Sequence, residues 1–297
     1  MDFIDKFIRQ HQLPEEFRDK ALRWYKPMAE AISLAHDKRC KPLLIGLNGC
    51  QGSGKSTAAE LVAEFLTLYY DKSAVSFSLD DFYLPKAERQ ALASRVNPLF
   101  TTRGVPGTHD MPLLLNTLRQ LKGGESTSVP SFDKAIDDRD FPEHWRAINS
   151  PMDIIILEGW CVGIEAQLDT SLISPTNALE ASEDPDGHWR GYVNQQLKGD
   201  YQQLNNRIDL LIMLKAPSFQ YVYEWRLEQE QKLRQYLSDN HLDATAMTDA
   251  QVEHFTQFFQ RITEHGLKTL PDKVDLLFNL DENRVIYEMA YPKGVIQ

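Results

Sequence analysis

The sequence has little cysteine and no long apolar run, and each shortage argues against certain classes of protein. Its 297 residues include three cysteines, Cys40, Cys50 and Cys161. Their odd number, and the lack of any C-x-x-C spacing, argue against a disulfide framework and against a zinc cage. The longest apolar runs, residues 154–157 and 210–214, are far shorter than the roughly 18 to 20 residues that span a bilayer. We therefore expect reduced thiols and no membrane span.

Basic residues are in the minority. The chain has 32 Lys and Arg against 43 Asp and Glu, a formal net charge of −11. This is the wrong sign for a surface that follows nucleic-acid phosphates, so any anionic ligand must be held at a local site. The N-terminus mixes charges of both signs and has no signal-peptide pattern. We expect a cytoplasmic protein that binds neither nucleic acid nor membrane. Its oligomeric state stays open, and a monomer is compatible with the sequence.

The order of apolar patterns predicts an α/β fold. Strand-length apolar runs occur at residues 43–48, 74–79, 154–157 and 210–214, and a closing strand pair is expected near 274–289. Helical patterns occur at residues 55–70, 113–121, 191–206, 217–237 and 249–270. Such alternation predicts a mainly parallel, doubly wound sheet with helices on both faces. Residues 1–40 are predicted to form an N-terminal helical extension, and residues 41–297 the main domain.

Two stretches lack clear periodicity. Residues 86–110 contain scattered Pro, Gly and Asn, and are predicted to be an irregular, functional loop region. Residues 165–190 carry Pro, Gly and several acidic side chains, and are predicted to be a solvated loop.

The strongest motif follows the first predicted strand. It reads Gly49-Cys50-Gln51-Gly52-Ser53-Gly54-Lys55-Ser56, continues into Thr57, and fits G-x-x-x-x-G-K-[ST]. A strand, a Gly-rich loop and a helix N-terminus together cradle a polyphosphate with backbone N–H groups. Lys55 would then reach the β- and γ-phosphates of ATP, and Ser56 would bind Mg²⁺. A Gly-rich turn without a ligand is the alternative.

Carboxylates end two of the predicted strands. Asp80 and Asp81 follow the strand at residues 74–79, and Glu158 ends the strand at residues 154–157. Parallel strands deliver such side chains to the crevice at their carboxyl ends. Only one of the adjacent pair is expected to face the phosphates, while the other caps the next turn or faces solvent. Glu158 is predicted to bind the metal or a metal-bound water, with a surface position as the alternative.

Several segments, taken in order, carry a family resemblance. They are GLNGCQGSGKST, SLDDFYL, RGVPGTHDMP, VPSFDKAIDDR, IIILEGWCVG and YVYEWRLEQE. The resemblance that they carry spans roughly residues 43 to 290. In that order they resemble the D-glycerate 3-kinases of plant type and their fungal and bacterial relatives. The chain is more distantly similar to uridine kinase, phosphoribulokinase and bacterial pantothenate kinase. The resemblance implies a P-loop NTPase fold with a helical lid, ATP and Mg²⁺ at Lys55 and Ser56, and Asp80 as the base for the substrate hydroxyl.

The chain departs from its relatives at two places. Phe132 stands where many relatives have Tyr, and the acidic residues 180–186 look like a local insertion. These departures bear on the acceptor rather than on the kinase chemistry.

The acceptor candidates lie in two irregular segments. They are Arg103, His109, Asp110, Lys134 and Arg139. A carboxylate or sugar-acid substrate needs a fixed cation, preferably Arg, and acceptors for its hydroxyl groups. A purely structural role for His109 remains open, and Lys134 and Arg139 are alternatively solvated loop charges.

Two arginines on the helical pattern after Pro217 are candidates for contact with the transferring phosphoryl group. Arg226 and Arg234 are eight residues apart, which places them near one helical face. Lid arginines are expected in phosphoryl transfer. The alternative is a salt-bridged face, because Glu228 and Glu230 are close by. We favour Arg226 as catalytic and leave Arg234 open.

These observations predict an ATP-dependent kinase for a small molecule. The favoured reaction transfers the γ-phosphoryl group to D-glycerate and yields 3-phosphoglycerate. One alternative is a kinase for another small acceptor, such as uridine or pantothenate. The other is a nucleotide-dependent regulatory ATPase, which would need no acceptor pocket.

Overall fold

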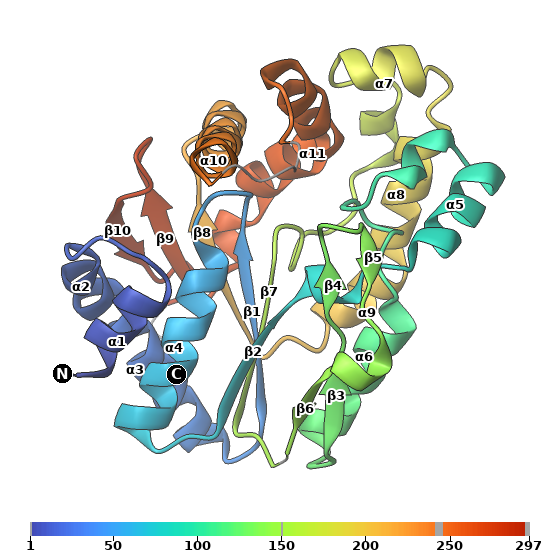
Figure 1. Cartoon of the computed structure of the whole chain (residues 1–297). Coiled ribbons are helices and arrows are strands. Elements are labelled where there is room, and N and C mark those ends of the chain that lie inside the picture. Colours follow the sequence, from blue (N-terminus) through green and yellow to red (C-terminus); the bar gives the residue numbers. More distant parts are fainter. Residues whose placement is uncertain (1, 150, 241–245, 295–297) are drawn as a thin grey trace.

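A six-stranded sheet runs through the computed structural model, which describes residues 2–149, 151–240 and 246–294 (Figure 1). Its strands are β1 (Leu43–Gly49), β2 (Ala74–Ser78), β7 (Ile154–Gly159), β8 (Leu210–Lys215), β9 (Leu276–Leu280) and β10 (Ile286–Ala290). They lie in the order β10-β9-β8-β1-β7-β2, and all neighbours are parallel except β10 and β9. The mainly parallel sheet that the sequence predicts is confirmed.

Helices cover both faces of the sheet (Figure 1). One face carries α1 (Phe3–Gln10), α2 (Phe17–Lys20), α3 (Lys26–Arg39) and α4 (Lys55–Tyr70), and the other carries α6 (Met111–Lys122), α8 (His188–Lys198) and α9 (Asp200–Asn205). Alternate residues of β1 point to opposite faces, as the pleat requires. Leu43, Ile45 and Leu47 join the cluster of the first group of helices, and Leu44 joins the cluster of the second.

The N-terminal extension is helical, as predicted. Between α2 and α3, residues 21–25 form a π-helical turn. Tyr25, Met28 and Ile32 are buried in the cluster that also contains apolar residues of β1 and α4. The extension therefore shares a core with the sheet. A domain boundary after residue 40 stays a proposal about how the chain is organised.

The prediction of an irregular segment at residues 86–110 is wrong in its first part, which forms helix α5 (Lys86–Arg95). Pro85, just before the segment, occupies the N-cap position, and the first proline within the segment, Pro98, lies beyond the end of α5. Arg89 is fully buried and donates to the carbonyls of Thr101 at 2.7 Å and Asp137 at 2.6 Å. These bonds join α5 to the rest of the segment at Thr101, and to a more distant part of the chain at Asp137.

The prediction of a solvated loop at residues 165–190 is also wrong in part, because α7 (Ala178–Glu183) and the start of α8 lie within it. Two of its acidic residues are buried with arginine partners. Glu180 accepts two hydrogen bonds from Arg261, at 2.7 and 2.6 Å, and Asp184 pairs with Arg190 at 2.9 Å. The acidic composition suggested that these carboxylates lie in solvent, whereas in the structure they are buried and paired with arginines. The helix expected at residues 191–206 is divided into α8 and α9 at Gly199.

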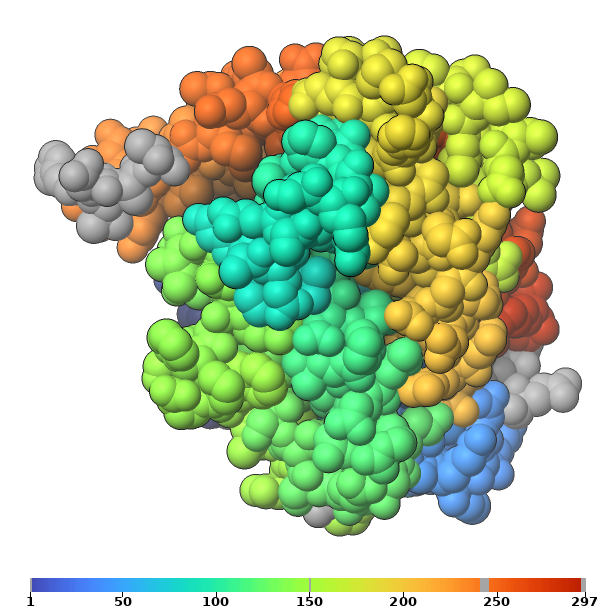
Figure 2. Space-filling view, turned by 90° about the vertical axis from the view of Figure 1, so that its right-hand side faces the viewer, coloured from blue at the N-terminus to red at the C-terminus, as the bar shows by residue number. Residues whose placement is uncertain are grey.

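Figure 2 shows these two corrected segments side by side on one surface, α5 in turquoise and α7 with α8 in yellow. The side-chain amide of Asn97 donates to the carbonyl of Glu183 at 3.4 Å, and Phe100 packs edge-on against Tyr192. Together they cover the side of the molecule beside the carboxyl end of the sheet.

The elements around that end complete the fold. Small antiparallel pairs, β3 (Thr127–Val129) with β6 (Arg146–Ile148) and β4 (Phe132–Asp133) with β5 (Asp138–Arg139), lie beyond β2. Two long helices that pack together, α10 (Phe219–Asp239) and α11 (Asp249–Thr269), lie above the strand ends where the resemblance places a lid (Figure 1). Among the described residues, no helix has both the length and the apolar character to cross a membrane.

Candidate active site

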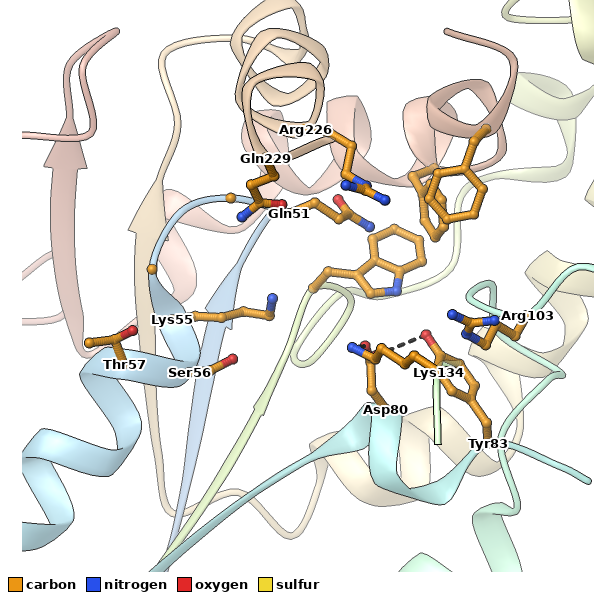
Figure 3. Close-up of a pocket in the computed structure, with 15 residues that line it drawn as sticks. Gln51, Lys55, Ser56, Thr57, Asp80, Tyr83, Arg103, Lys134, Arg226 and Gln229 are labelled. Carbon is orange, nitrogen blue, oxygen red and sulfur yellow. Dashed lines mark hydrogen bonds and ion pairs between the residues drawn. The ribbon is translucent and has the colours of Figure 1, made fainter. Parts of the chain in front are cut away.

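A cavity of about 490 Å³ opens at the carboxyl end of the sheet (Figure 3). The residues that line it come from the Gly-rich loop and the start of α4, the turn after β2, the segment between α5 and α6, the β4–β5 hairpin, the end of β7, α10 and α11. They are Gln51, Gly52, Gly54, Lys55, Ser56, Thr57, Asp80, Tyr83, Arg103, Lys134, Trp160, Arg226, Gln229, Phe255 and Phe259. The structure thus brings most of the predicted nucleotide residues together with four of the predicted acceptor and catalytic residues.

The Gly-rich loop joins β1 to α4, as the motif predicts. Gly52 and Gly54 have φ values of +77° and +84°, which side chains rarely adopt. A Cβ atom at Gly52 would also lie 2.7 Å from the Cβ of Trp225 on α10. The loop therefore needs glycine both for its turn and for the close approach of α10.

Lys55, Ser56 and Glu158 meet beneath this loop. The Ser56 hydroxyl donates to Glu158 Oε1 at 2.7 Å, and Lys55 Nζ lies 3.9 Å from Glu158 Oε2. Burial alone would lower the pKa of Lys55, but the carboxylates of Glu158 and Asp80 raise it above its ordinary value. The ammonium therefore stays charged where a polyphosphate would bind.

The same residues fit a magnesium ion. Glu158 is 4% exposed, and its Oε2 atom has no hydrogen-bond partner in the described part of the chain. A hydroxyl and a carboxylate oxygen are ligands that Mg²⁺ prefers, with phosphates and water supplying the rest. The described residues contain no group of three or more His, Cys, Asp or Glu side chains suited to a metal. Ser56 and Glu158 would hold the ion together with a bound nucleotide.

Asp80 and Asp81 have different environments. Asp80 lines the cavity, where Tyr83 donates to its Oδ1 at 2.8 Å and Lys134 to its Oδ2 at 3.2 Å. Burial alone would raise the pKa of Asp80, but the ammonium groups of Lys134 and Lys55 lower it. Asp81 instead accepts from the Ser78 backbone N–H at 2.9 Å and caps the turn. Burial raises the pKa of Asp81 to about 6, and the charge of Asp80 adds to the effect.

Arg103 enters the cavity from the opposite side to the Gly-rich loop (Figure 3). Its guanidinium lies over the Phe132 ring at 5.2 Å and pairs with Asp137. Phe132, the departure from the relatives, thus supports the arginine with its ring face. Lys134, in the β4–β5 hairpin, is 63% exposed. Its side chain lines the cavity and forms an ion pair with Asp80.

The other three acceptor candidates do not line the cavity. His109 is buried, its Nδ1 lies 2.6 Å from the Tyr201 hydroxyl, and burial lowers the pKa of His109 to about 4. Asp110 caps α6 by accepting from the Leu113 N–H at 3.0 Å. Arg139 donates to the Tyr83 carbonyl at 3.1 and 2.9 Å and pairs with Asp110 at 3.1 Å. These contacts hold the wall of the cavity in place.

The two candidate arginines on α10 also differ in whether they line the cavity. Arg226 lines the cavity and pairs with Glu230 at 2.6 Å within α10. Arg234 does not line it and pairs with Asp249 at the start of α11. The ion-pair alternative thus holds for both side chains, and Arg226 also faces the Gly-rich loop (Figure 3).

The sequence reasoning gave no role to several lining residues. Tyr83, Trp160, Gln229, Phe255 and Phe259 lie in the cavity wall. Tyr83 follows Asp80 by three residues, and Trp160 follows Glu158 by two. Their nearness to a carboxylate at a strand end is a sequence signal that could have identified them. Phe255 and Phe259 gave no signal, because a helical aromatic pair is ordinarily read as core.

Cys50, inside the Gly-rich loop, is 6% exposed. Burial raises the pKa of its thiol to about 12, which opposes the thiolate that backbone N–H groups would favour. Cys50 is therefore a buried thiol that does not ionise readily.

Comparison with known proteins agrees with this geometry. Residues 44–173 match the model of the phosphoribulokinase/uridine kinase family. An uncharacterized kinase of Schizosaccharomyces pombe is 37% identical over 258 residues, 82% of this chain and 90% of that protein. The chloroplastic D-glycerate 3-kinase of Arabidopsis thaliana is 31% identical over 264 residues, 82% of this chain and 53% of that protein. The solved D-glycerate 3-kinase from Cryptococcus neoformans var. grubii has 25% identity and a TM-score of 0.74, and the match covers 90% of this chain and 98% of that one.

The family match includes the Gly-rich loop, Asp80 and Glu158, which lie in or beside the cavity. The chain therefore belongs to the phosphoribulokinase/uridine kinase family and is a kinase of the P-loop type.

Proposed function

We propose that this kinase transfers the γ-phosphoryl group of ATP to the primary hydroxyl of D-glycerate and yields 3-phosphoglycerate and ADP. The observation that carries the proposal is the charge of the cavity wall. Lys55, Arg103, Lys134 and Arg226 are cationic, and Asp80 is the one carboxylate among the described lining residues. A cavity of this charge suits two anionic substrates side by side. Two relatives that carry the name D-glycerate 3-kinase support the same acceptor.

The nucleotide roles go to the Gly-rich loop and its neighbours. Residues 49–57 would hold the phosphates of ATP, with the Lys55 ammonium on the β- and γ-phosphates. Mg²⁺, held by Ser56 and Glu158, would neutralise and orient the phosphate oxygens. Arg226 would meet the charge that develops on the transferring group, where fixed cations act strongly because water is excluded.

The acceptor roles go to Asp80 and Arg103. The Asp80 carboxylate would take the proton of the acceptor hydroxyl while the hydroxyl oxygen bonds to the γ-phosphorus and the β–γ bridging oxygen leaves with ADP. Arg103 would pair with the glycerate carboxylate, because a buried anion without a partner costs several kcal/mol. Asp137, its present partner, is 34% exposed and keeps a second arginine partner in Arg89 at 2.9 Å. Arg103 can therefore turn to a ligand without leaving Asp137 unpaired.

The alternatives differ in what the cavity must provide. Uridine carries no charge and needs no arginine beyond the phosphate site. A regulatory ATPase needs no acceptor cavity opposite the loop. The position of Arg103, across the cavity from Lys55, favours an anionic acceptor over both (Figure 3). A cytoplasmic location also remains a prediction from the sequence.

ADP release with a panel of acceptors tests the proposal. We expect Mg-ATP with D-glycerate to release ADP much faster than Mg-ATP with uridine, pantothenate, ribulose 5-phosphate or no acceptor. Fastest release with uridine or pantothenate would replace glycerate by that acceptor. Release that no acceptor changes would favour the regulatory ATPase.

A further inference from the structure

Tyr83 is buried in the wall of the cavity and is tied to Asp80. Its side chain is 4% exposed, and its hydroxyl donates to Asp80 Oδ1 at 2.8 Å. Its backbone N–H also donates to the Asp80 carbonyl at 3.3 Å, which closes the turn between the two residues. The phenol and the carboxylate therefore form one rigid unit.

The ring of Tyr83 is held from three directions. It stacks on His109 with ring centroids 4.5 Å apart and meets Phe132 edge-on at 5.2 Å. Arg139 binds its carbonyl with two hydrogen bonds, and the Tyr201 hydroxyl fixes His109 at 2.6 Å. Two of the acceptor candidates that do not line the cavity, the buried His109 and the half-buried Arg139, thus contact Tyr83.

The two oxygens of Asp80 are held very differently. Oδ1 accepts from the fixed phenol of Tyr83, while Oδ2 accepts from Lys134, which is 63% exposed and belongs to a surface hairpin. A solvated lysine at 3.2 Å is easily displaced, because an exposed ion pair contributes little. Oδ2 is therefore the oxygen that an incoming hydroxyl can reach.

We propose that Tyr83 is a positioning residue that occupies Asp80 Oδ1 and presents Oδ2 to the acceptor hydroxyl. The inference rests on the proposed role of Asp80, but not on the identity of the acceptor. In the transfer step the acceptor O–H proton moves to Oδ2, the oxygen bonds to the γ-phosphorus, and the β–γ bridging oxygen departs with ADP. The phenol keeps its own proton throughout.

A double-mutant cycle tests the coupling. Tyr83→Phe keeps the stacked ring and removes only the hydroxyl. We expect kcat to fall about tenfold with the KM for ATP within about twofold of wild type, because orientation and not nucleotide binding is lost. Asp80→Asn should lower kcat by roughly 10². In the Asp80→Asn background, Tyr83→Phe should change kcat by less than about twofold, because coupled residues are not additive.

The matched control is Tyr192→Phe on α8, which removes a hydroxyl from a half-buried ring that packs on Phe100 outside the cavity lining. It should leave kcat unchanged. A full tenfold loss from Tyr83→Phe in both backgrounds, or wild-type kcat in the single variant, would overturn the proposal. The assay uses whichever acceptor of the panel gives the highest rate.

A second readout needs no acceptor at all. Carboxyl-carbon NMR of protein labelled at Asp, with the Asp80 signal identified by its loss in Asp80→Asn, follows the titration of this group directly. Lys55, Lys134, His109 and Asp81 also face Asp80 and are unchanged by the substitution. Tyr83→Phe should move the Asp80 midpoint upward, because a hydrogen bond to the charged form is lost.

The two proposals can fail separately. Suppose that the Asp80 midpoint moves upward in Tyr83→Phe but the wild-type enzyme has no activity on D-glycerate. This result would contradict D-glycerate as the acceptor and support the role of Tyr83. Activity of the wild-type enzyme on D-glycerate, together with an unchanged Asp80 midpoint in Tyr83→Phe, would support D-glycerate as the acceptor and contradict the role of Tyr83.

Discussion

The two sides of the cavity, to which we assign the nucleotide and the acceptor, are built in different ways. The nucleotide side comes from one contiguous stretch, residues 49–57, together with Glu158 on the neighbouring strand. The acceptor side combines Asp80, Arg103 and Lys134 from three separate segments. Backbone geometry shapes the first, whereas ion pairs and stacked rings shape the second. The difference predicts that the nucleotide side tolerates little change, while the acceptor side can be altered one residue at a time.

The largest effect is expected at the centre of the nucleotide side. Lys55→Ala removes the ammonium next to Glu158, and should lower kcat by at least about 10², because fixed charge stabilises the transferring phosphoryl group. The fold should remain, so the circular dichroism spectrum should match that of wild type. Coupled ADP release measures the rate. Activity within about threefold of wild type, less than 1 kcal/mol of barrier, would contradict the assignment of the loop.

The acceptor side should separate two arginines that the sequence treats alike. Arg103 lines the cavity, whereas Arg139 holds the Tyr83 carbonyl and Asp110 outside it. Arg103→Ala should raise the KM for D-glycerate about tenfold, or about 1.4 kcal/mol of lost binding, with little change for ATP.

Arg139→Ala should act mainly through stability, because the Tyr83 carbonyl loses its side-chain donor and Asp110 loses its ion pair. We expect a lower melting temperature, measured by thermal unfolding, and a KM for D-glycerate that changes less than in Arg103→Ala. Equal KM increases in the two variants, with unchanged melting temperatures, would contradict this division.

The same contrast shows what the sequence can predict. The Gly-rich loop between its strand and its helix follows from a local pattern, because a contiguous motif fixes its own backbone. The acceptor side depends on tertiary partners that no local pattern specifies. His109, for example, has the chemistry of a ligand-binding residue, but the Tyr201 hydroxyl and the Tyr83 ring enclose it.

Burial of charge explains the remaining wrong predictions. Acidic residues near Glu180 suggested solvent because the sequence does not show that Arg261, 81 positions later, lies against that carboxylate. Arg89 likewise converts a stretch rich in turn-forming residues into an anchored helix and loop. Long-range arginine pairs are thus the feature that composition and periodicity missed.

Cysteine reactivity gives a smaller test of the nucleotide side. Cys40 is exposed, whereas Cys50 is buried with the pKa of its thiol raised to about 12. At pH 8 an alkylating reagent should therefore label Cys40 at least about 10²-fold faster, because the thiolate is the nucleophile. Peptide mass spectrometry measures both rates. Rapid labelling of Cys50 that Mg-ATP suppresses would show instead that the loop opens and activates its thiol.

The smallest effect is expected at Asp81, which follows Asp80 in the chain but does not line the cavity. Its pKa of about 6 in the folded protein lies above the ordinary value of 3.8, so the folded state holds this proton longer than the unfolded state. As pH rises from about 4 through 6, the unfolded carboxyl ionises first, and the stability that the protonated form contributed is lost. Near neutral pH the buried Asp81 carboxylate therefore destabilises the fold next to Asp80 and Glu158.

Asp81→Asn keeps an oxygen for the Ser78 N–H and removes that charge. We expect the free energy of unfolding in urea to rise by about 1 kcal/mol at pH 7.5, and by much less at pH 4, where Asp81 is largely protonated in the folded state. Asp71→Asn, at an exposed position after α4, is the control and should change neither value by more than about 0.5 kcal/mol. An Asp81→Asn variant that is less stable than wild type at pH 7.5 would show that the carboxylate caps the turn better than the amide. In that case both aspartates stabilise their own side of the cavity as charged groups, and the contrast between Asp80 and Asp81 would be one of position alone.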